Sequence, residues 1–328
     1  KGVIISNFIV APRRFLHLSV LDNNLHTTHY TLRITGLFSM ALFSLAVTFM
    51  LSSTSVAELP MATFPECGIP YLPSVCPNDL QEEWWQISYI PHENLETVMA
   101  SEVDGASGVS ADLAWRLSTG SFSTLISVGD SGIQWEDTAL TNKIYVNVGE
   151  VPYPQYYDSA GELVLGDSWD TDGNGLVNVQ DWADDPRVHI DAGVDVADHM
   201  LDASDLIYTF SDGVDDDMNG YVDDISGWDF FGEDNDPWNT FNTGFGTHGT
   251  EVMVDGAAEG NDGDGKIGMC PNCAVLPVRL GDTFVVDGYR AAQGIAFAVD
   301  SGAQSMGLAV GAMSTPENMA LAVEYAHE

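Results

Sequence analysis

The residues of this sequence that are best suited to chemistry are one histidine and several aspartates. His248 stands in the segment FGTHGTEVMVDGAAEG, where glycine and threonine precede a run of small residues that predicts the start of a helix. A histidine in this position can act as a catalytic base, bind a metal or cap the helix. Two aspartates are candidate partners for it. Asp130 follows the apolar run Ser123–Val128, and Asp191 lies in the segment HIDAGVD.

Further aspartates lie between Asp130 and His248, in a stretch rich in Asp, Asn and Gly. The segment DTDGNGLVNVQD (Asp170–Asp181) matches the twelve-residue calcium loop of helix–loop–helix proteins, with Gly175 at the sharp turn. Its expected ligands are Asp170, Asp172, Asn174, the carbonyl of Leu176, Asn178 and Asp181. A hard cation needs six or more converging oxygens, and this spacing supplies them. The aspartate at the last position resembles the dockerin variant of the loop.

A second segment, DDDMNGYVDD (Asp215–Asp224), repeats this spacing. Its expected ligands are Asp215, Asp217, Asn219, the carbonyl of Tyr221 and Asp223. Ser226 stands at the twelfth position, where a carboxylate is expected, so an acidic, solvated turn is the alternative. A third stretch, Asp198–Asp205, keeps only half of the pattern and predicts a weak site.

Strands and helices that alternate along the chain must position these residues. The expected strands are Ser123–Val128, Ala274–Leu280 and Ala303–Gly311, and the expected helices are Val286–Gly302 and Ser314–Glu328. The last helix begins with a capping-box pattern from Ser314 to Glu317, with Pro316 in its first turn. This alternation predicts an α/β fold whose parallel sheet is covered by helices on both faces. Function gathers at the carboxyl ends of such strands, and Asp130 occupies one of them.

Four segments together resemble the subtilisin-like serine peptidases, or subtilases. They are STLISVGDSGI, NGYVDDISGWDFFGEDNDP, GTHGTEVMVDGAAEG followed by CPNCAVLPVRLGD, and AFAVDSGAQSMGLAVG. The resemblance implies a subtilisin-like fold, protein or peptide substrates, and a triad in the order Asp, His, Ser. Asp130 and His248 would supply its first two members, with Asp191 as the alternative aspartate. The serine would be activated by His248, and the aspartate would fix the tautomer of the imidazole.

The sequence departs from the family pattern in three ways. Glu251 stands where the family usually has a second histidine, and Gly129 replaces a bulky residue before Asp130. The Gly-Thr-Ser segment and the oxyanion asparagine are not found in the 328 residues. Ser301, Ser305 and Ser314 lack the setting of a nucleophile. We therefore expect the amino-terminal part of a peptidase domain, truncated at its carboxyl end and inactive as it stands. The alternative is a calcium-dependent binding module or inactive pseudo-peptidase that docks a partner through its calcium loop.

The composition is strongly acidic. Asp and Glu number 49 against 10 Lys and Arg, which gives a formal net charge of −39. Such a surface repels nucleic acids and anionic membranes, and it favours divalent cations. The composition therefore argues against nucleic-acid binding and supports Ca²⁺ as a cofactor.

The amino-terminal part of the chain contains the pattern of a targeting signal. Ile34–Ala57 lacks charge and ends in Ser-Val-Ala, which has the form of a signal-peptidase site. It predicts export to the outside of the cell or the cell envelope, without membrane attachment after cleavage near Ala57; a single membrane anchor is the alternative. The expected organisation is an upstream extension and signal peptide (1–57), an amino-terminal segment (58–110) and a partial peptidase domain (111–328). The calcium-loop insertion spans 151–238. The segment 58–110 is either a removable pro-region or a permanent cap.

Four cysteines form two close pairs, Cys67 with Cys76 and Cys270 with Cys273. The second pair has the spacing of a redox motif or of half a zinc site. It precedes an expected strand, whereas a redox motif opens a helix. An exported protein permits disulfides, so two local structural disulfides are expected.

Overall fold

The computed structural model describes residues 108–193, 199–239, 246–260, 266–312 and 316–327. It also describes the short pieces 3–4, 19–21, 27–29, 63–64, 67, 76–77 and 86. The expected signal segment, Ile34–Ala57, lies outside these residues, as does most of the segment 58–110. No helix within the described part of the chain has the length and apolar character needed to cross a bilayer.

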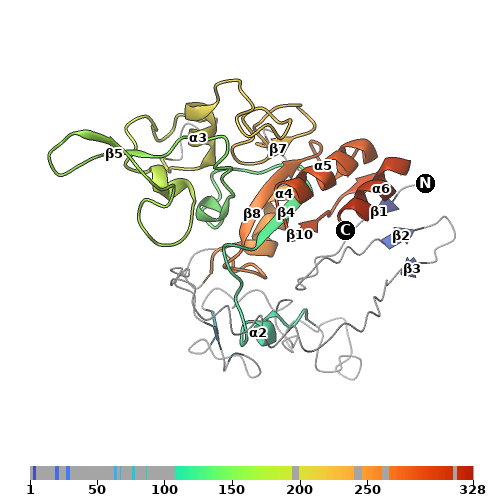
Figure 1. The fold of residues 1–328 in the computed structure, drawn as a ribbon. Helices are drawn as coiled ribbons and strands as arrows, with labels where there is room; N and C mark the ends of the chain where they lie inside the picture. Colours follow the sequence, from blue (N-terminus) through green and yellow to red (C-terminus); the bar gives the residue numbers. More distant parts are fainter. Residues whose placement is uncertain are drawn as a thin grey trace, which may run out of the picture.

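A four-stranded parallel sheet forms the centre of the fold (Figure 1). In spatial order its strands are β10 (Ser305–Gly307), β4 (Leu125–Asp130), β8 (Ala274–Arg279) and β7 (Trp228–Asp229). The β4–β8 register runs from Leu125 opposite Ala274 to Asp130 opposite Arg279. Every residue of β4 and β8 is buried, as expected for parallel strands covered on both faces.

Helices cover both faces of this sheet. The alternation of side chains along the strands shows which helix lies on which face. These helices are α4 (His248–Ala257), α5 (Gly288–Asp300) and α6 (Glu317–Tyr325). Ile126 and Val128 of β4 pack in one core cluster with Met253 of α4. Leu276 of β8 packs in a second cluster with Ile295 of α5. The predicted α/β architecture is therefore confirmed. Asp130 shares the strand face of Ile126 and Val128, which is the face that α4 covers.

The predicted elements differ from the observed ones mainly at their ends. The strand predicted at Ser123–Val128 begins at Leu125 and continues to Asp130, and the helix predicted at Val286–Gly302 spans Gly288–Asp300. The third predicted strand is much shorter, because only three residues pair with β4. The last helix begins at Glu317, since Pro316 has an extended ψ of 157° and is the N-cap. Ser314 lies outside the described residues.

The remaining elements are short. They are β1 (Val3–Ile4), β2 (Ser19–Leu21), β3 (Thr27–His29), α2 (Ala111–Ala114), η4 (Thr141–Lys143), β5 (Gln155–Tyr157), β6 (Leu163–Leu165), η5 (Val179–Trp182), α3 (Ala203–Phe210), β9 (Val285–Val286) and β11 (Gly311–Ala312). In a small sheet β11 pairs with β9 in parallel and with β1 in antiparallel. The strands β5 and β6 form an antiparallel hairpin, and so do β2 and β3.

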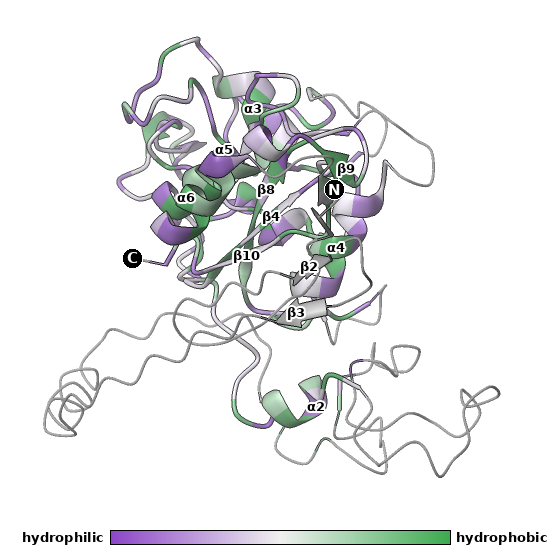
Figure 2. Cartoon of the chain, turned by 90° about the vertical axis from the view of Figure 1, so that its right-hand side faces the viewer, coloured by the Kyte–Doolittle hydropathy of each residue, from purple (hydrophilic) through white to green (hydrophobic). Residues whose placement is uncertain are grey.

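The acidic segment predicted as an insertion, residues 151–238, is anchored by large apolar side chains. Trp182 at the end of η5 and Leu206 of α3 are fully buried in the cluster that contains Met253 of α4. Figure 1 shows the insertion, with β5 and α3, on the opposite side of β8 from α5 and α6. Figure 2 shows hydrophilic residues along the loops around α3 and hydrophobic residues in β4 and β8. The insertion thus packs on the side of the sheet that carries Asp130.

Both predicted disulfides are present, Cys67–Cys76 and Cys270–Cys273. The second lies directly before β8, as its position before an expected strand indicated. The first packs against Trp115, whose indole N–H donates to the carbonyl of Met269 at 3.1 Å. Trp115 thus joins the Cys67–Cys76 disulfide to the segment that leads into β8.

Candidate active site

Asp130 and His248 are joined although 118 residues separate them in the sequence. His248 is the first residue of α4, and Asp130 is the last residue of β4. The imidazole Nδ1 lies 2.8 Å from Asp130 Oδ1, a distance at which the ring N–H donates a hydrogen bond to the carboxylate. The Asp130 side chain is fully buried, whereas the His248 side chain is 30% exposed. The pair therefore combines a rigid, desolvated carboxylate with an imidazole that solvent can reach.

The hydrogen bond from His248 has an electrostatic consequence. Asp130, as its hydrogen-bond acceptor and nearby charge, raises the pKa of His248 above its ordinary value, and the charge of Glu251 adds a smaller effect. Partial burial of the imidazole acts in the opposite direction. A buried carboxylate that stabilises an imidazolium is the arrangement that general-base catalysis by histidine requires.

Ser131 joins the end of β4 to the start of α4. Its backbone N–H donates to Asp130 Oδ1 at 2.7 Å. Its hydroxyl accepts from the backbone N–H of Gly249 at 2.9 Å and donates to the carbonyl of Gly246 at 3.1 Å. The buried amide of Asn239 donates to the same Gly246 carbonyl at 2.9 Å and also to the carbonyl of Ser131. Ser131 and Asn239, which the sequence analysis did not single out, thus hold the segments of Asp130 and His248 together.

Glycine is required where the two segments approach most closely. A Cβ atom on Gly249 would lie 2.3 Å from the carbonyl oxygen of Gly132, which itself has a φ of +97°. Gly129 is also confined, because a Cβ there would lie 2.6 Å from Met306 and 2.7 Å from Leu308. Bulky neighbours thus fill the space that a larger residue before Asp130 would need, so the departure at Gly129 is compensated by packing.

The alternative aspartate, Asp191, lies elsewhere. Its Oδ2 is 2.7 Å from Nδ1 of His199, and its Oδ1 accepts from the backbone N–H of the same residue at 2.8 Å. These bonds lie inside the insertion. Of the two aspartates between which the sequence left a choice, Asp130 is the one hydrogen-bonded to His248.

Comparison with known families agrees with this geometry. Residues 122–328, more than half of the chain, match the sequence model of the subtilase family. The chain belongs to the subtilase family. The matched range contains both Asp130 and His248, and the parallel sheet with helices agrees with a subtilisin-like fold. The family is one of serine-type peptidases, which implies proteins or peptides as the class of substrate. No curated protein gives a significant match to the chain.

The first predicted calcium loop of this subtilase brings three carboxylates together. Oxygens of Asp170, Asp172 and Asp181 lie within 4.8 Å of one another. Asp181 is buried, and its carboxylate accepts from the N–H groups of Thr171 at 2.7 Å and Asn178 at 3.0 Å. Burial raises the pKa of Asp181, although these hydrogen bonds oppose the shift.

The other predicted ligands of this loop make local contacts. The amide of Asn174 donates to Asp172 Oδ2 at 2.8 Å, and the side-chain oxygen of Asn178 caps η5 by accepting from the N–H of Gln180 at 2.9 Å. The side chain of Leu176 is buried in the core. Asp170, Asp172 and Asp181 are therefore the carboxylates placed to hold a cation.

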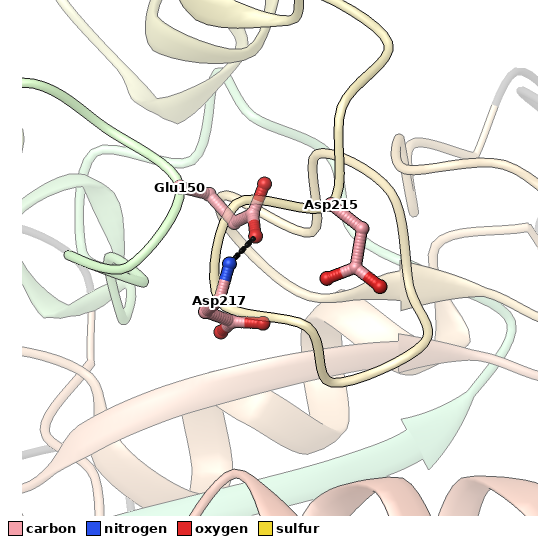
Figure 3. A group of neighbouring side chains, drawn as sticks. All are labelled: Glu150, Asp215 and Asp217. Carbon is pink, nitrogen blue, oxygen red and sulfur yellow. Dashed lines mark hydrogen bonds between the residues drawn. The ribbon is translucent and has the colours of Figure 1, made fainter.

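The second loop differs from its predicted ligand set. Asp215 and Asp217 gather with Glu150, which the sequence did not suggest, and their oxygens lie within 4.8 Å of one another (Figure 3). The Asp223 carboxylate is not part of this group and accepts from the N–H groups of Asp212 at 3.0 Å and Gly213 at 2.9 Å. Asp223 as a calcium ligand therefore stays a prediction.

The remaining residues of the predicted set are Asn219 and Tyr221, and they lie close to Asp224 in the loop. Tyr221 packs edge-on against Trp228 with ring centroids 5.1 Å apart. The amide of Asn219 donates to Asp224 Oδ2 at 3.0 Å, and the amide of Asn147 donates to Asp224 Oδ1 at 2.8 Å. Burial raises the pKa of Asp224 to about 7 against the effect of these amides. The loop therefore concentrates negative charge around a partly buried centre.

Proposed function

We propose that this subtilase is an exported, calcium-stabilised serine endopeptidase. Asp130 and His248 are its aspartate and its general base, and its nucleophilic serine is not among the 328 residues of the sequence. The observation that carries the proposal is the 2.8 Å hydrogen bond between His248 Nδ1 and the buried Asp130 carboxylate, within a chain that belongs to a serine peptidase family.

The proposed mechanism follows from the tautomer that this bond selects. Because Nδ1 donates to Asp130, the other ring nitrogen, Nε2, carries the lone pair that can accept a proton from a serine hydroxyl. Asp130 then stabilises the imidazolium that forms, and His248 returns the proton to the leaving amine. The buried carboxylate keeps the ring oriented through both steps.

Calcium has a structural part in the proposal. The first loop offers Asp170, Asp172 and Asp181 as charged oxygen ligands for one Ca²⁺ ion. Its charge would offset the mutual repulsion of the acidic insertion, whose Trp182 packs against the core beneath α4. Ile34–Ala57 is proposed as the export signal. Amino-terminal sequencing of the secreted protein tests it, since the signal predicts a first residue at or after Glu58.

Labelling of the full-length protein with a serine-directed fluorophosphonate tests the catalytic roles. His248→Ala is expected to abolish labelling, because the serine then lacks a base. Asp130→Asn is expected to reduce it strongly, and Asp191→Asn serves as the matched control that leaves it unchanged. Labelling that survives His248→Ala, or that depends on Asp191, would contradict the assignment. A folded full-length protein that never labels would favour an inactive pseudo-peptidase that acts as a calcium-dependent binding module.

A further inference from the structure

The second acidic loop contains a carboxylate from a distant part of the chain. Glu150 lies 65 residues before Asp215, on the segment that follows η4, and its side chain projects toward the loop (Figure 3). One of its oxygens, Oε1, accepts from the backbone N–H of Asp217 at 3.0 Å. Glu150 is only 3% exposed, and its second oxygen, Oε2, is buried without a hydrogen-bond partner among the described residues.

This cluster also lacks a protein counter-charge. Among the residues that the structure describes, no lysine, arginine or histidine forms an ion pair with Glu150, Asp215 or Asp217. A buried carboxylate is costly unless it is paired with a positive charge or binds a metal. Glu150 therefore marks a place where a cation fits, and it does so independently of the spacing within the loop.

The twelfth position of the loop explains why a ligand from outside the loop is needed. In a self-contained calcium loop the twelfth residue closes the site with a carboxylate. Here that position is Ser226, which is fully buried, and Asp223 is engaged by backbone N–H groups of a neighbouring turn. At the end of the loop Asp224 accepts from the amides of Asn147 and Asn219, so no carboxylate stands at the twelfth position itself. Glu150 supplies the missing negative charge from the other side.

We propose that Asp215, Asp217 and Glu150 form a second Ca²⁺ site, which links the segment after η4 to the loop before β7. Backbone carbonyls and water would complete the oxygen shell that Ca²⁺ requires. The proposal rests on and extends the calcium binding proposed above, and it adds Glu150, a ligand that spacing within the loop does not reveal.

The position of the site gives the ion a structural effect. The two linked segments already share a backbone hydrogen bond, from the N–H of Asn147 to the carbonyl of Ile225 at 2.8 Å. Ile225 lies shortly before β7, whose Asp229 pairs with Arg279 at the end of β8. Arg279 in turn lies opposite Asp130 in the β4–β8 register. A bound ion would therefore stiffen the connection between the insertion and the strand ends at the active site.

Titration of chelator-stripped full-length protein with Ca²⁺, followed by calorimetry, tests the site. Glu150→Gln removes the charge and keeps an oxygen that can accept from the Asp217 N–H. It is expected to weaken one of two sites by at least about 10-fold. The matched control is Asp216→Asn, which removes a charge from an exposed residue of the same loop outside the cluster, and about 2-fold or less is expected. Equal effects of the two variants, or wild-type binding by Glu150→Gln, would overturn the proposal.

Two further measurements separate this site from the first loop and from misfolding. Asp181→Asn is expected to weaken the other site only. If Asp181→Asn weakens binding and Glu150→Gln does not, the second site fails while the first stands. If the wild-type protein binds no Ca²⁺, both calcium proposals fail and the peptidase assignment is unaffected. In chelator, Glu150→Gln is expected to melt no lower than the wild type, because an unpaired buried charge has been removed. A lower melting temperature there would assign Glu150 a purely structural role.

Discussion

The hydroxyl of Ser131 accepts a hydrogen bond from the backbone N–H of Gly249 at 2.9 Å, so the residue after Asp130 is bonded to the residue after His248. This contact fixes the first turn of α4 against the end of β4. The distance between the carboxylate and the imidazole is thereby set by backbone and hydroxyl groups that take no part in proton transfer.

Ser131→Ala tests this positioning role. The change leaves the buried N–H of Gly249 without its acceptor and removes one hydrogen bond to the Gly246 carbonyl. A loss of about 1–3 kcal/mol in the free energy of unfolding is therefore expected. Fluorophosphonate labelling should slow as well. Ser131→Thr keeps the hydroxyl and should restore the labelling rate. Equal labelling rates of the alanine variant and the wild type would show that the hydroxyl does not position His248.

Gly249→Ala tests the close approach of the two segments. Its Cβ would meet the Gly132 carbonyl, which is backbone and cannot move aside without shifting β4, so a loss of about 1–3 kcal/mol is expected in denaturant unfolding. Gly294→Ala in α5 is the control. Its Cβ would lie 2.8 Å from Leu280 Cδ2 and 3.1 Å from Val278 Cγ1, which are side-chain ends and not backbone, and alanine favours the helix, so a smaller loss is expected. Similar losses for both variants would contradict this prediction.

The raised pKa of His248 predicts the acid side of the pH profile. The base works only when neutral, so the labelling rate of the full-length protein should rise with pH through a midpoint above the ordinary histidine pKa of about 6.5. Glu251→Gln removes a negative charge that favours the imidazolium and should move this midpoint to lower pH. A midpoint that rises or stays fixed in this variant would exclude Glu251 as a contributor.

The raised pKa of His248 also predicts how the stability of the fold depends on pH. Because the pKa of His248 is higher in the folded state than in the unfolded chain, the protonated pair stabilises the fold. That contribution is complete below the unfolded pKa and is lost as the pH rises through the folded pKa. Urea unfolding of His248→Gln at a pH below 6 and at pH 8 should therefore show a larger loss relative to wild type at the lower pH. A loss that is equal at both values would contradict the assignment of the shift to this bond.

Calcium removal tests the first loop. Chelator should lower the melting temperature of the secreted protein, because the carboxylates of Asp170, Asp172 and Asp181 then repel one another without a counter-charge. Asp181→Asn removes a ligand of the first loop. The difference between the melting temperatures with and without chelator should therefore be smaller in this variant than in the wild type. An unchanged wild-type melting curve in chelator would contradict a stabilising role for Ca²⁺.

Several features could be predicted from the sequence because they depend on neighbouring residues. The apolar run before Asp130 and the glycine-rich entrance to the His248 helix follow from side-chain periodicity and backbone freedom. The Asp-x-Asp-x-Asn-Gly spacing likewise gathers Asp170 and Asp172, since backbone N–H groups of the same turn bond their carboxylates. The order of these motifs was sufficient to indicate the subtilase family, which the family comparison confirms.

Other features depended on the tertiary structure. Asp130 and Asp191 both precede glycine-containing turns, and only the β4–β8 register and the packing of α4 bring Asp130 to His248. Glu150 reaches Asp217 across 67 residues, a contact that spacing within the loop does not reveal, and Asp223 accepts from the N–H of Asp212. Local spacing fixes which groups one turn can gather. Contacts between distant segments depend on how the sheet and its covering layers pack, and that packing is a property of the whole chain.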